Sequence, residues 1–371
     1  MNGNIKIARI WGIPVYINYS WFLVFFLTTW SLATGYFPNE YPVLSLTVHL
    51  ILGAITSLLF FASVLAHELG HSFLALRDRI PVKGITLFIF GGVAQISQEP
   101  RSPGSEFRIA IAGPLTSLAL AGFFGGLYLL DQSIPILAAP SGYLMRINLI
   151  LAFFNLIPGF PLDGGRVFRA LVWKWTGSLQ KATHIASTAG QLVAFGFIGF
   201  GIYMVINGQF FNGLWLVFIG WFLQNAASSA YLQVNIQQAL AGLKVSQVMN
   251  RNLSTIDYLT PVSQLVEEKV VGLNQQTFFV ERNGEIVGNI SIQDILKLNR
   301  SKWRFTTVQQ IMRPNQNTTN VEAETDLMTA LQTMERAQLN QISVFESGIP
   351  IGILSRDQVI KYARMHAELS L

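Results

Sequence analysis

Long apolar runs separated by short polar connections fill residues 1–235 of the chain. A helix of about 20 apolar residues is long enough to cross a lipid bilayer. About six runs reach this length and predict membrane-spanning helices: Val15–Tyr36, Val48–Leu76, Phe107–Leu130, Ile136–Ile157, Ile185–Ile206 and Phe211–Tyr231. The second run is longer than one crossing requires, so its C-terminal end is expected to extend below the hydrocarbon.

The connection between the second and third runs follows a different pattern. The stretch VKGITLFIFGGVAQIS is rich in β-branched and aromatic residues around Gly91 and Gly92, which predicts strands and a bend rather than a helix. Strand edges at membrane depth must be covered by protein or by a watery cavity. Two interpretations stay open. The segment is an interfacial hairpin that packs on the helices, or its edge pairs with an extended peptide, with Gly91 and Gly92 as substrate-positioning residues.

From about Gly242 the pattern changes to short strands that alternate with helices, and charged residues become frequent. Two copies of one pattern follow each other here. The stretch VSQVMNRNLSTI corresponds to VQQIMRPNQNTTNV, and FFVERNGEIVGNISIQDIL corresponds to ISVFESGIPIGILSRDQVI. A repeat at a fixed spacing indicates a tandem module. We therefore predict a transmembrane domain over residues 1–235 and two soluble α/β repeats over residues 243–300 and 305–366.

Composition supports a membrane protein. The chain has 51% hydrophobic and 12% charged residues and a mean hydropathy of +0.42, whereas about a quarter of the residues in soluble domains are charged. The chain has no cysteine, which excludes disulfides, thiolate catalysis and cysteine-bound zinc. The basic N-terminal stretch is not followed by a short apolar core with a cleavage site, so the first run is interpreted as a retained span.

Lys and Arg residues predict the orientation of the spans. They gather in three places: Lys6 and Arg9 before the first run, Arg77, Arg79, Lys83, Arg101 and Arg108 between the second and third runs, and Arg166, Arg169, Lys174 and Lys181 after the fourth. The opposite connections hold Glu40 and Asp131 and almost no basic residues. Basic connections face the cytoplasm, so both termini and the soluble repeats are predicted to be cytoplasmic. The net charge of +5 fits these loops and does not indicate a nucleic-acid partner.

The stretch FFASVLAHELGHSFLAL places three ionisable residues inside the second apolar run. His67 and His71 lie four residues apart, so a helix brings both imidazoles to one face, about 40° apart in projection. Glu68 stays free to transfer a proton between a metal-activated water and a leaving amine. Two buried structural histidines are the alternative, but ionisable groups within a membrane are usually functional. The pattern therefore predicts a zinc-dependent hydrolase.

A catalytic zinc needs a third protein ligand and an open coordination position. Asp163, in FFNLIPGFPLDGGR, is the best candidate because the predicted topology places it at the depth of the two histidines. The adjacent Gly164 and Gly165 leave the backbone free to turn toward the metal. Two alternatives stay open: His184 is the third ligand, or Asp163 is the N-cap of the helix that follows.

Asn155 lies earlier in the same segment, near the end of the fourth run. Its amide is a candidate hydrogen-bond donor to the substrate carbonyl or to the oxyanion that develops during hydrolysis. An interhelical hydrogen bond is the alternative role.

HELGH in an apolar helix, a later NLIPGFPLDG and the Gly-Gly segment between them resemble the site-2 protease family of intramembrane zinc metalloproteases. The resemblance covers residues 1–235. It implies that His67, His71 and Asp163 bind one zinc ion, Zn²⁺, and that Glu68 is the general base. It also implies that Asn155 assists the substrate carbonyl and that FIFGGVAQI holds the unwound substrate. A PDZ domain, which some relatives insert among the spans, is not recognised in this sequence.

The two soluble repeats resemble a pair of cystathionine-β-synthase (CBS) repeats, which form a Bateman module. This resemblance implies binding of an adenine nucleotide (ATP, ADP or AMP). The candidate nucleotide-binding residues are Gly288, Ser291, Asp294, Ser355 and Asp357. The second repeat has Gln358 at the position where an aspartate is expected, so one nucleotide site is expected rather than two. A structural or dimerising pair of repeats, forming a homodimer, is the alternative.

Together these features predict an α-helical polytopic membrane protein with a small membrane-associated β element, followed by a soluble α/β tandem. The expected function is cleavage of the transmembrane segments of single-span proteins, such as anti-sigma-factor-like proteins, in the bilayer of a bacterial plasma membrane. Nucleotide binding to the CBS pair is expected to gate cleavage. The alternatives are a CBS-regulated metal transporter or channel that uses the same cluster for transit, and a nucleotide-sensing scaffold with an inactive site. Residues 1–235 show no repeated halves, which are frequent in transporters.

Overall fold

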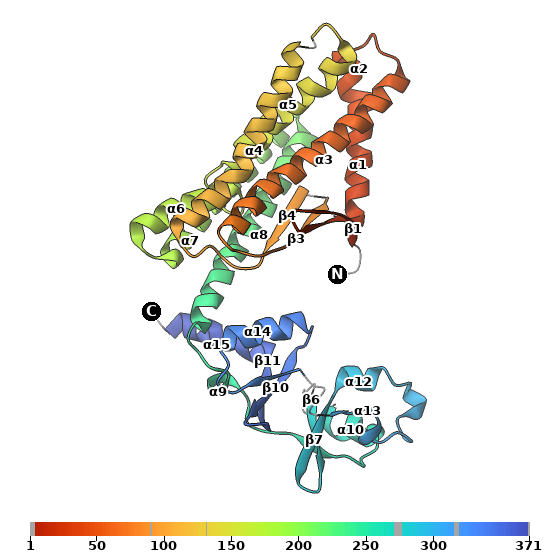
Figure 1. Ribbon diagram of the computed structural model, residues 1–371, viewed down its shortest axis with the longest axis vertical. Helices are drawn as coiled ribbons and strands as arrows, with labels where there is room; N and C mark the ends of the chain where they lie inside the picture. Colours follow the sequence, from red (N-terminus) through yellow and green to blue (C-terminus); the bar gives the residue numbers. More distant parts are fainter. Residues whose placement is uncertain (1–3, 90, 131, 271–276, 315–318, 370–371) are drawn as a thin grey trace. The chain divides into compact units, whose positions relative to one another are not determined.

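The chain divides into two compact units, Met1–Leu232 and Gln233–Leu371 (Figure 1). The computed structural model describes residues 4–89, 91–130, 132–270, 277–314 and 319–369. Residues 271–276 of the first predicted repeat and residues 315–318 of the second lie outside the described residues.

Helices make up most of the first unit. They are α1 (Tyr19–Ser31), the π-helical segment η1 (Leu32–Tyr36), α2 (Phe37–Glu40), α3 (Leu46–Arg77), α4 (Pro103–Leu130), α5 (Pro135–Asn155), α6 (Asp163–Thr176), α7 (Leu179–Ile206) and α8 (Phe210–Leu240), whose residues from Gln233 onward belong to the second unit. Within the described residues, five helices are long and apolar enough to cross a membrane: Leu46–Arg77, Pro103–Leu130, Pro135–Asn155, Leu179–Ile206 and, within α8, Phe210–Ser229. These five correspond to the second to sixth predicted spans.

The first predicted span, Val15–Tyr36, differs from the structure at its start. Its first residues belong to strand β2 (Ile13–Asn18), and the helix begins at Tyr19. Asn18 caps this helix, because its side chain accepts a hydrogen bond from the Ser20 backbone N–H at 3.0 Å. Alternate residues of β2 are buried, which is the period of a half-buried strand. The alternation predicts a strand, but a search for long apolar runs alone does not detect it.

A four-stranded sheet lies in the first unit with strand order β1-β2-β3-β4. Its other strands are β1 (Asn4–Ile10), β3 (Val82–Phe88) and β4 (Gly91–Ile96). The β1–β2 hairpin turns at Trp11 and Gly12, whose φ angles of 48° and 81° are both positive, as a type I′ turn requires. This N-terminal hairpin was not predicted. The expected strands and bend around Gly91 are confirmed by β3 and β4.

One core joins the sheet to α1 and to α3, the helix that carries His67 and His71. Ile17 of β2 and Leu87 of β3 pack against Trp21 of α1 and against Phe61 and Val64 of α3. All five side chains are at least about nine-tenths buried. Burying a large apolar side chain stabilises a fold by about 1.5–3 kcal/mol. The sheet is therefore held against the part of α3 that directly precedes His67.

The second unit consists of two small sheets with short helices. Its elements are α9 (Val245–Val248), β5 (Thr255–Asp257), α10 (Val262–Leu265), η2 (Val266–Val270), β6 (Thr277–Arg282), β7 (Glu285–Ser291), α12 (Ile292–Leu296), η3 (Arg300–Lys302), α13 (Val308–Ile311), β8 (Arg313–Pro314), β9 (Asn320–Glu322), α14 (Leu327–Arg336), β10 (Gln341–Glu346), β11 (Ile349–Ser355) and α15 (Arg356–Leu369). The strand orders are β5-β6-β7-β8 and β11-β10-β9. The predicted α/β character of the tail is confirmed.

The two sequence repeats exchange their leading segments. Val308 and Met312, which open the second repeat, pack in the core around β6 and β7 of the first. Val245 and Met249, which open the first repeat, pack in the core around β10 and β11 of the second. Strand β8 accordingly pairs with β7. A buried hydrogen bond of 3.0 Å from the side chain of Asn289 to Ser343 also links the halves. Neither repeat completes its own core.

We therefore expect residues 239–369 to fold alone, whereas residues 243–304 alone should not fold. The shorter fragment lacks Val308, Ile311 and Met312, which pack in its core. Burial of these side chains contributes on the order of 5 kcal/mol to the free energy of unfolding, and the whole stability of a small domain is of similar size. Urea unfolding followed by circular dichroism distinguishes the two fragments. A steep cooperative transition in the shorter fragment would contradict the exchange.

Candidate metal centre

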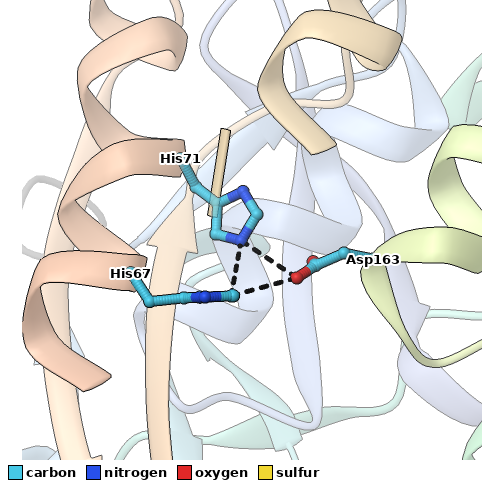
Figure 2. A group of neighbouring side chains, drawn as sticks. All are labelled: His67, His71 and Asp163. Carbon is cyan, nitrogen blue, oxygen red and sulfur yellow. Dashed lines mark hydrogen bonds and ion pairs between the residues drawn. The ribbon is translucent and has the colours of Figure 1, made fainter. Parts of the chain in front are cut away.

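Three ionisable side chains from two helices converge on one point (Figure 2). His67 and His71 lie one turn apart on α3, and Asp163 is the first residue of α6. Asp163 Oδ2 lies 3.1 Å from His67 Nε2 and 3.2 Å from His71 Nε2, and the two Nε2 atoms are 3.2 Å apart. Ligands about 2.0–2.1 Å from a tetrahedral zinc ion lie about 3.3 Å from one another. The three separations therefore suit one zinc ion.

The chemistry and the space around the three side chains also fit a metal. Two imidazole nitrogens and one carboxylate oxygen are a common ligand set for catalytic zinc. Both histidines are about 95% buried. A Cβ atom added to Gly113 of α4 would overlap His71 Nε2 and lie 2.5 Å from His67 Nε2. Glycine at this position therefore keeps the space beside the ligand atoms open.

The second nitrogen of each imidazole is held by α4. His71 Nδ1 lies 2.7 Å from the backbone carbonyl of Ile109, and His67 Nδ1 lies 2.9 Å from Ser117 Oγ. A carbonyl oxygen only accepts hydrogen bonds, so His71 must carry its proton on Nδ1 and present an unprotonated Nε2. Such contacts orient metal-binding histidines and fix their tautomers.

Glu68 lies beside the cluster and contacts strand β4. The backbone N–H of Ala94 donates a hydrogen bond to Glu68 Oε2 at 3.1 Å. A Cβ atom on Gly92 would lie 2.6 Å from Glu68 Cγ, so glycine is needed for this close approach. Gly91, at the start of β4, has φ +122°, a conformation that favours glycine. The two predicted substrate-positioning glycines therefore bring β4 against Glu68.

Strand β4 also ends the sheet. It pairs with β3 on one side, and no strand pairs with its other side among the described residues. The Ala94 N–H points to this second side, because it donates its hydrogen bond to Glu68 of α3 rather than to a backbone carbonyl of β3. Glu68 therefore lies at the edge of the sheet, on the side of β4 with which no described strand pairs.

The segment before α6 places Asp163 by close packing. Leu162, rather than Asp163, is the N-cap residue of α6, so the capping alternative is not what the structure shows. A Cβ atom on Gly164 would overlap the Leu156 backbone, and one on Gly165 would overlap the Gly159 backbone. Both glycines are helical, and they allow close approach of the chain rather than the free turn that was expected.

The other two candidates lie outside the ligand cluster. His184 is exposed on α7 and does not belong to the cluster found among the described residues. Asn155 is the last residue of α5 and is half-buried. Within the described part of the chain, the hydrogen bonds of the cluster do not include Asn155, so its assistance to the substrate stays a prediction.

A buried ion pair near the cluster was not predicted. Glu106 of α4 binds Arg169 of α6, and both side chains are at least 95% buried. In the sequence, Arg169 indicated only the orientation of the spans. A charged residue in a mainly apolar stretch indicates that it needs a partner of opposite charge. No sequence pattern, however, shows which residue is that partner when the two lie 63 positions apart.

The nucleotide-binding candidates of the first repeat make contacts within the tail. Ser291 and Asp294 form a reciprocal cap at the start of α12, and Asp294 Oδ1 also accepts a hydrogen bond from Arg313 Nε at 3.1 Å. A Cβ atom on Gly288 would overlap the Arg313 carbonyl. These contacts give all three residues structural roles, and their nucleotide contacts stay a prediction.

The second repeat has a similar arrangement. Ser355 Oγ donates a hydrogen bond to Gln358 Oε1 at 3.1 Å, so Gln358 takes the place that Asp294 has in the first repeat. Asp357 is exposed in the first turn of α15. The sequence motif thus describes a strand followed by a capped helix, whether or not a ligand binds.

Replacing Asp294 with Asn should destabilise the isolated tail in a pH-dependent way. Burial alone would raise the pKa of the Asp294 carboxyl, but the hydrogen bond from Ser291 and the Arg313 guanidinium outweigh it and hold the pKa below its ordinary 3.8. The carboxylate therefore stabilises the fold fully above pH 3.8, and this stabilisation is lost as the pH falls through the lower folded pKa. We expect a deficit of about 1–2 kcal/mol at pH 7.

Urea unfolding of residues 239–369 at pH 7, 5 and 3 measures this deficit, which should be unchanged at pH 5 and smaller at pH 3. Lys297→Gln is the matched control, because Lys297 lies 3.7 Å from Asp294 Oδ1 with its side chain 74% exposed. Such an exposed pair contributes little. A deficit for the Asp294 variant that grows on acidification would contradict the assigned contacts.

Comparison with known proteins gives a consistent picture of both units. Residues 55–139 and 131–197 match the family model of peptidase family M50, and residues 245–301 and 308–364 match the CBS domain. Protein sll0528 of Synechocystis, named as a zinc metalloprotease, is 38% identical over 97% of this chain and 96% of its own length. Zinc metalloprotease MJ0392 of Methanocaldococcus jannaschii is 31% identical over the same shares. The solved site-2 protease from Methanocaldococcus jannaschii is 29% identical, with a TM-score of 0.40, over 62% of this chain and 95% of its own.

Proposed function

Because the chain belongs to peptidase family M50, the zinc metalloprotease family of the site-2 proteases, we propose that it hydrolyses peptide bonds within the transmembrane segments of single-span membrane proteins. One observation carries this proposal: His67, His71 and Asp163 form a buried cluster of zinc-ligand geometry directly beside Glu68. The cluster lies on two helices, of which α3 is long and apolar enough to cross the bilayer.

The chain's own residues divide the chemistry among them. His67, His71 and Asp163 would hold the zinc ion. When bound, zinc supplies Lewis-acid polarisation of the scissile carbonyl and makes a water molecule acidic enough to react near neutral pH. The Glu68 carboxylate takes the proton from the attacking water and delivers it to the leaving amine. The Ala94 N–H holds this carboxylate in place at 3.1 Å. Asn155 is proposed to donate a hydrogen bond to the carbonyl oxygen as charge develops on it.

The open edge of β4 is proposed to hold the substrate. The backbone amides of a transmembrane helix are bonded to one another, so the substrate must unwind before water can attack. An extended segment gains main-chain hydrogen bonds by pairing with a strand edge. Because Glu68 is bonded to that edge through Ala94, a segment paired there would place its peptide bonds beside the general base.

We propose the following cellular setting for this reaction. The chain lies in the plasma membrane of a bacterium with both termini and the CBS pair in the cytoplasm, which the distribution of Lys and Arg supports. Its substrates are single-span proteins of the anti-sigma-factor kind. The substrate's own apolar span brings it into the same bilayer as the five apolar helices of the enzyme.

The CBS pair is proposed to bind ATP, ADP or AMP and to gate proteolysis, and to support a homodimer. Two adjacent matches to the CBS domain support this proposal. A ligand gates the enzyme only if it binds two states of the chain with different affinity. The proposal is abandoned if none of the three nucleotides binds the full chain, or if binding leaves the rate of cleavage unchanged.

The purified full-length chain in liposomes, supplied with a tagged single-span substrate, tests the main proposal. Mass spectrometry of the products should locate a cut inside the apolar span of the substrate. The rival function, metal transport through the same cluster, predicts zinc flux across the liposome membrane. Zinc flux without any cut in several single-span substrates would favour the transporter and contradict the protease.

A further inference from the structure

One face of α4 contacts both histidines of the candidate metal centre. The Ile109 carbonyl holds His71, Ser117 holds His67, and Gly113 lies against the ligand nitrogens of both. Glu106 lies three residues before Ile109 and binds Arg169 of α6. Residues spaced by three or four positions lie on one face of a helix. The face that orients the two histidines thus also holds the helix that begins with the third ligand.

The contact between Glu106 and Arg169 is direct and buried. Arg169 Nε donates to Glu106 Oε1 at 2.6 Å, and Arg169 Nη2 binds the same oxygen. The Glu106 side chain is fully buried, and that of Arg169 is 5% exposed. Glu106 Oε2 is buried without a hydrogen-bond partner among the described residues. Arg166 Nε, also on α6, lies 4.0 Å from the same Glu106 oxygen. The compensation of this buried carboxylate therefore comes from α6, with Arg169 as the closer partner, and removing Glu106 would leave the buried Arg169 guanidinium without its main counterion.

Further contacts fix the direction of the Arg169 side chain. Its guanidinium lies over the Phe160 ring, with Cζ 5.0 Å from the ring centroid. Its Nη1 lies 3.6 Å from Glu99 Oε2. Phe160 belongs to the segment that leads into α6. The side chain is thus held between α4 and the approach to Asp163.

Arg169 and Asp163 move together because one helix carries both. They are six residues apart on α6, which corresponds to about 9 Å along a helix. The other two ligands share α3, so the relative position of α6 decides whether Asp163 reaches them. Loss of a group that hydrogen-bonds a metal ligand typically weakens metal binding by about 10- to 100-fold. A pair that places the helix of one ligand without touching that ligand is expected to act at the lower end of this range.

We infer that Glu106 and Arg169 are positioning residues that hold Asp163 where it can bind zinc with His67 and His71. The pair does not contact the metal, and it acts through the placement of α6 against α4. The inference rests on the proposed zinc site.

Zinc affinity of the purified full-length chain, measured by competition with a chromogenic chelator, tests this role. Glu106→Gln should weaken zinc binding by about 10-fold, the lower end of the range for outer contacts of a metal site. Arg108→Gln is the matched control, because Arg108 also forms an ion pair from the start of α4, at 2.9 Å, but with Asp78 at the end of α3 rather than with α6. This control should change the affinity less than twofold.

A double-mutant cycle separates positioning from a general structural role. In an Asp163→Asn background the third ligand is already impaired, so Glu106→Gln should add less than a twofold loss. An equal loss in both backgrounds would overturn the inference, because the pair would then act on the site by another route. If Glu106→Gln does not yield folded protein, the same cycle with Arg169→Lys, which keeps the positive charge, decides between the two outcomes.

The results also separate this inference from the proposed function. Wild-type protein that binds no zinc contradicts the metal site itself. Wild-type protein that binds zinc, with weaker binding in Asp163→Asn and unchanged binding in Glu106→Gln, overturns only the positioning role.

Discussion

Glu68→Gln should lower the rate of cleavage of a single-span substrate by about 100- to 10,000-fold, the range for loss of a general base, while the protein still binds one zinc per chain. The amide of Gln has no basic oxygen that can take a proton from water. Its carbonyl oxygen can still accept the hydrogen bond from the Ala94 N–H that Glu68 accepts at 3.1 Å, so the local structure should persist. Rates are measured in liposomes, and zinc is measured by elemental analysis of the same preparation.

Glu40→Gln is the control for this substitution. Glu40 lies at the end of α2, and its side chain is 47% exposed beside Arg146, outside the metal cluster. The control should cleave at the wild-type rate. A Glu68→Gln enzyme that cleaves as fast as wild type would exclude Glu68 as the general base, and a variant without zinc would show that Glu68 has a role in metal binding.

Gly113→Ala should abolish zinc binding and cleavage together. The added methyl group would overlap His71 Nε2 and lie 2.5 Å from His67 Nε2, which are the atoms that must face the metal. Neither ring can swing away easily, because Ile109 and Ser117 of the same helix hold their Nδ1 atoms. We expect less than about one-tenth of the wild-type zinc content and a loss of rate of at least about 100-fold, as for removal of a strict geometric requirement.

Gly122→Ala on the same helix is the matched control, because a Cβ atom there has nothing within 4 Å. It should bind zinc and cleave like wild type. Thermal unfolding of both variants shows whether the helix itself is affected. Full zinc content in a folded Gly113→Ala protein would mean that the metal lies elsewhere.

The helix that carries His67, Glu68 and His71 was predictable because its information is local. The spacing of His67, Glu68 and His71 within one apolar run specifies a shared helical face, and α3 is one continuous helix across them. Asp163 was predictable from topology, since the charge pattern places it at the same depth as the histidines. The roles of Gly164 and Gly165 were not, because close approach depends on which backbone lies opposite.

The partners that complete the site leave no pattern in the sequence. The group that orients His71 is the backbone carbonyl of Ile109, and any residue type carries such a carbonyl. Gly113 and Ser117 are unremarkable small residues within an apolar helix. Glu106 and Arg169 meet only because α4 and α6 pack together. Each of these contacts joins segments far apart in the chain, and a single sequence does not specify which helices become neighbours.

Two features of the fold were missed for other reasons. Strand β1 was not predicted, and most of β2 was included in the first span, because the alternation in IPVYIN was interpreted as part of a longer apolar run. The exchange of leading segments between the CBS repeats was also missed. A sequence repeat shows which segments are similar, but it does not show which segments pack together. Val245 begins the first repeat and packs in the core of the second, and Val308 begins the second repeat and packs in the core of the first.

The most direct test combines the metal and the reaction in one titration. Metal-free protein is titrated with zinc, and the rate of cleavage of a single-span substrate is measured at each step. If His67, His71 and Asp163 form one zinc site beside Glu68, the rate should rise in proportion to zinc and level off at one zinc per chain. Asp163→Asn should require a large excess of zinc. Cleavage that persists in the metal-free protein, or that does not depend on added zinc, would contradict this mechanism.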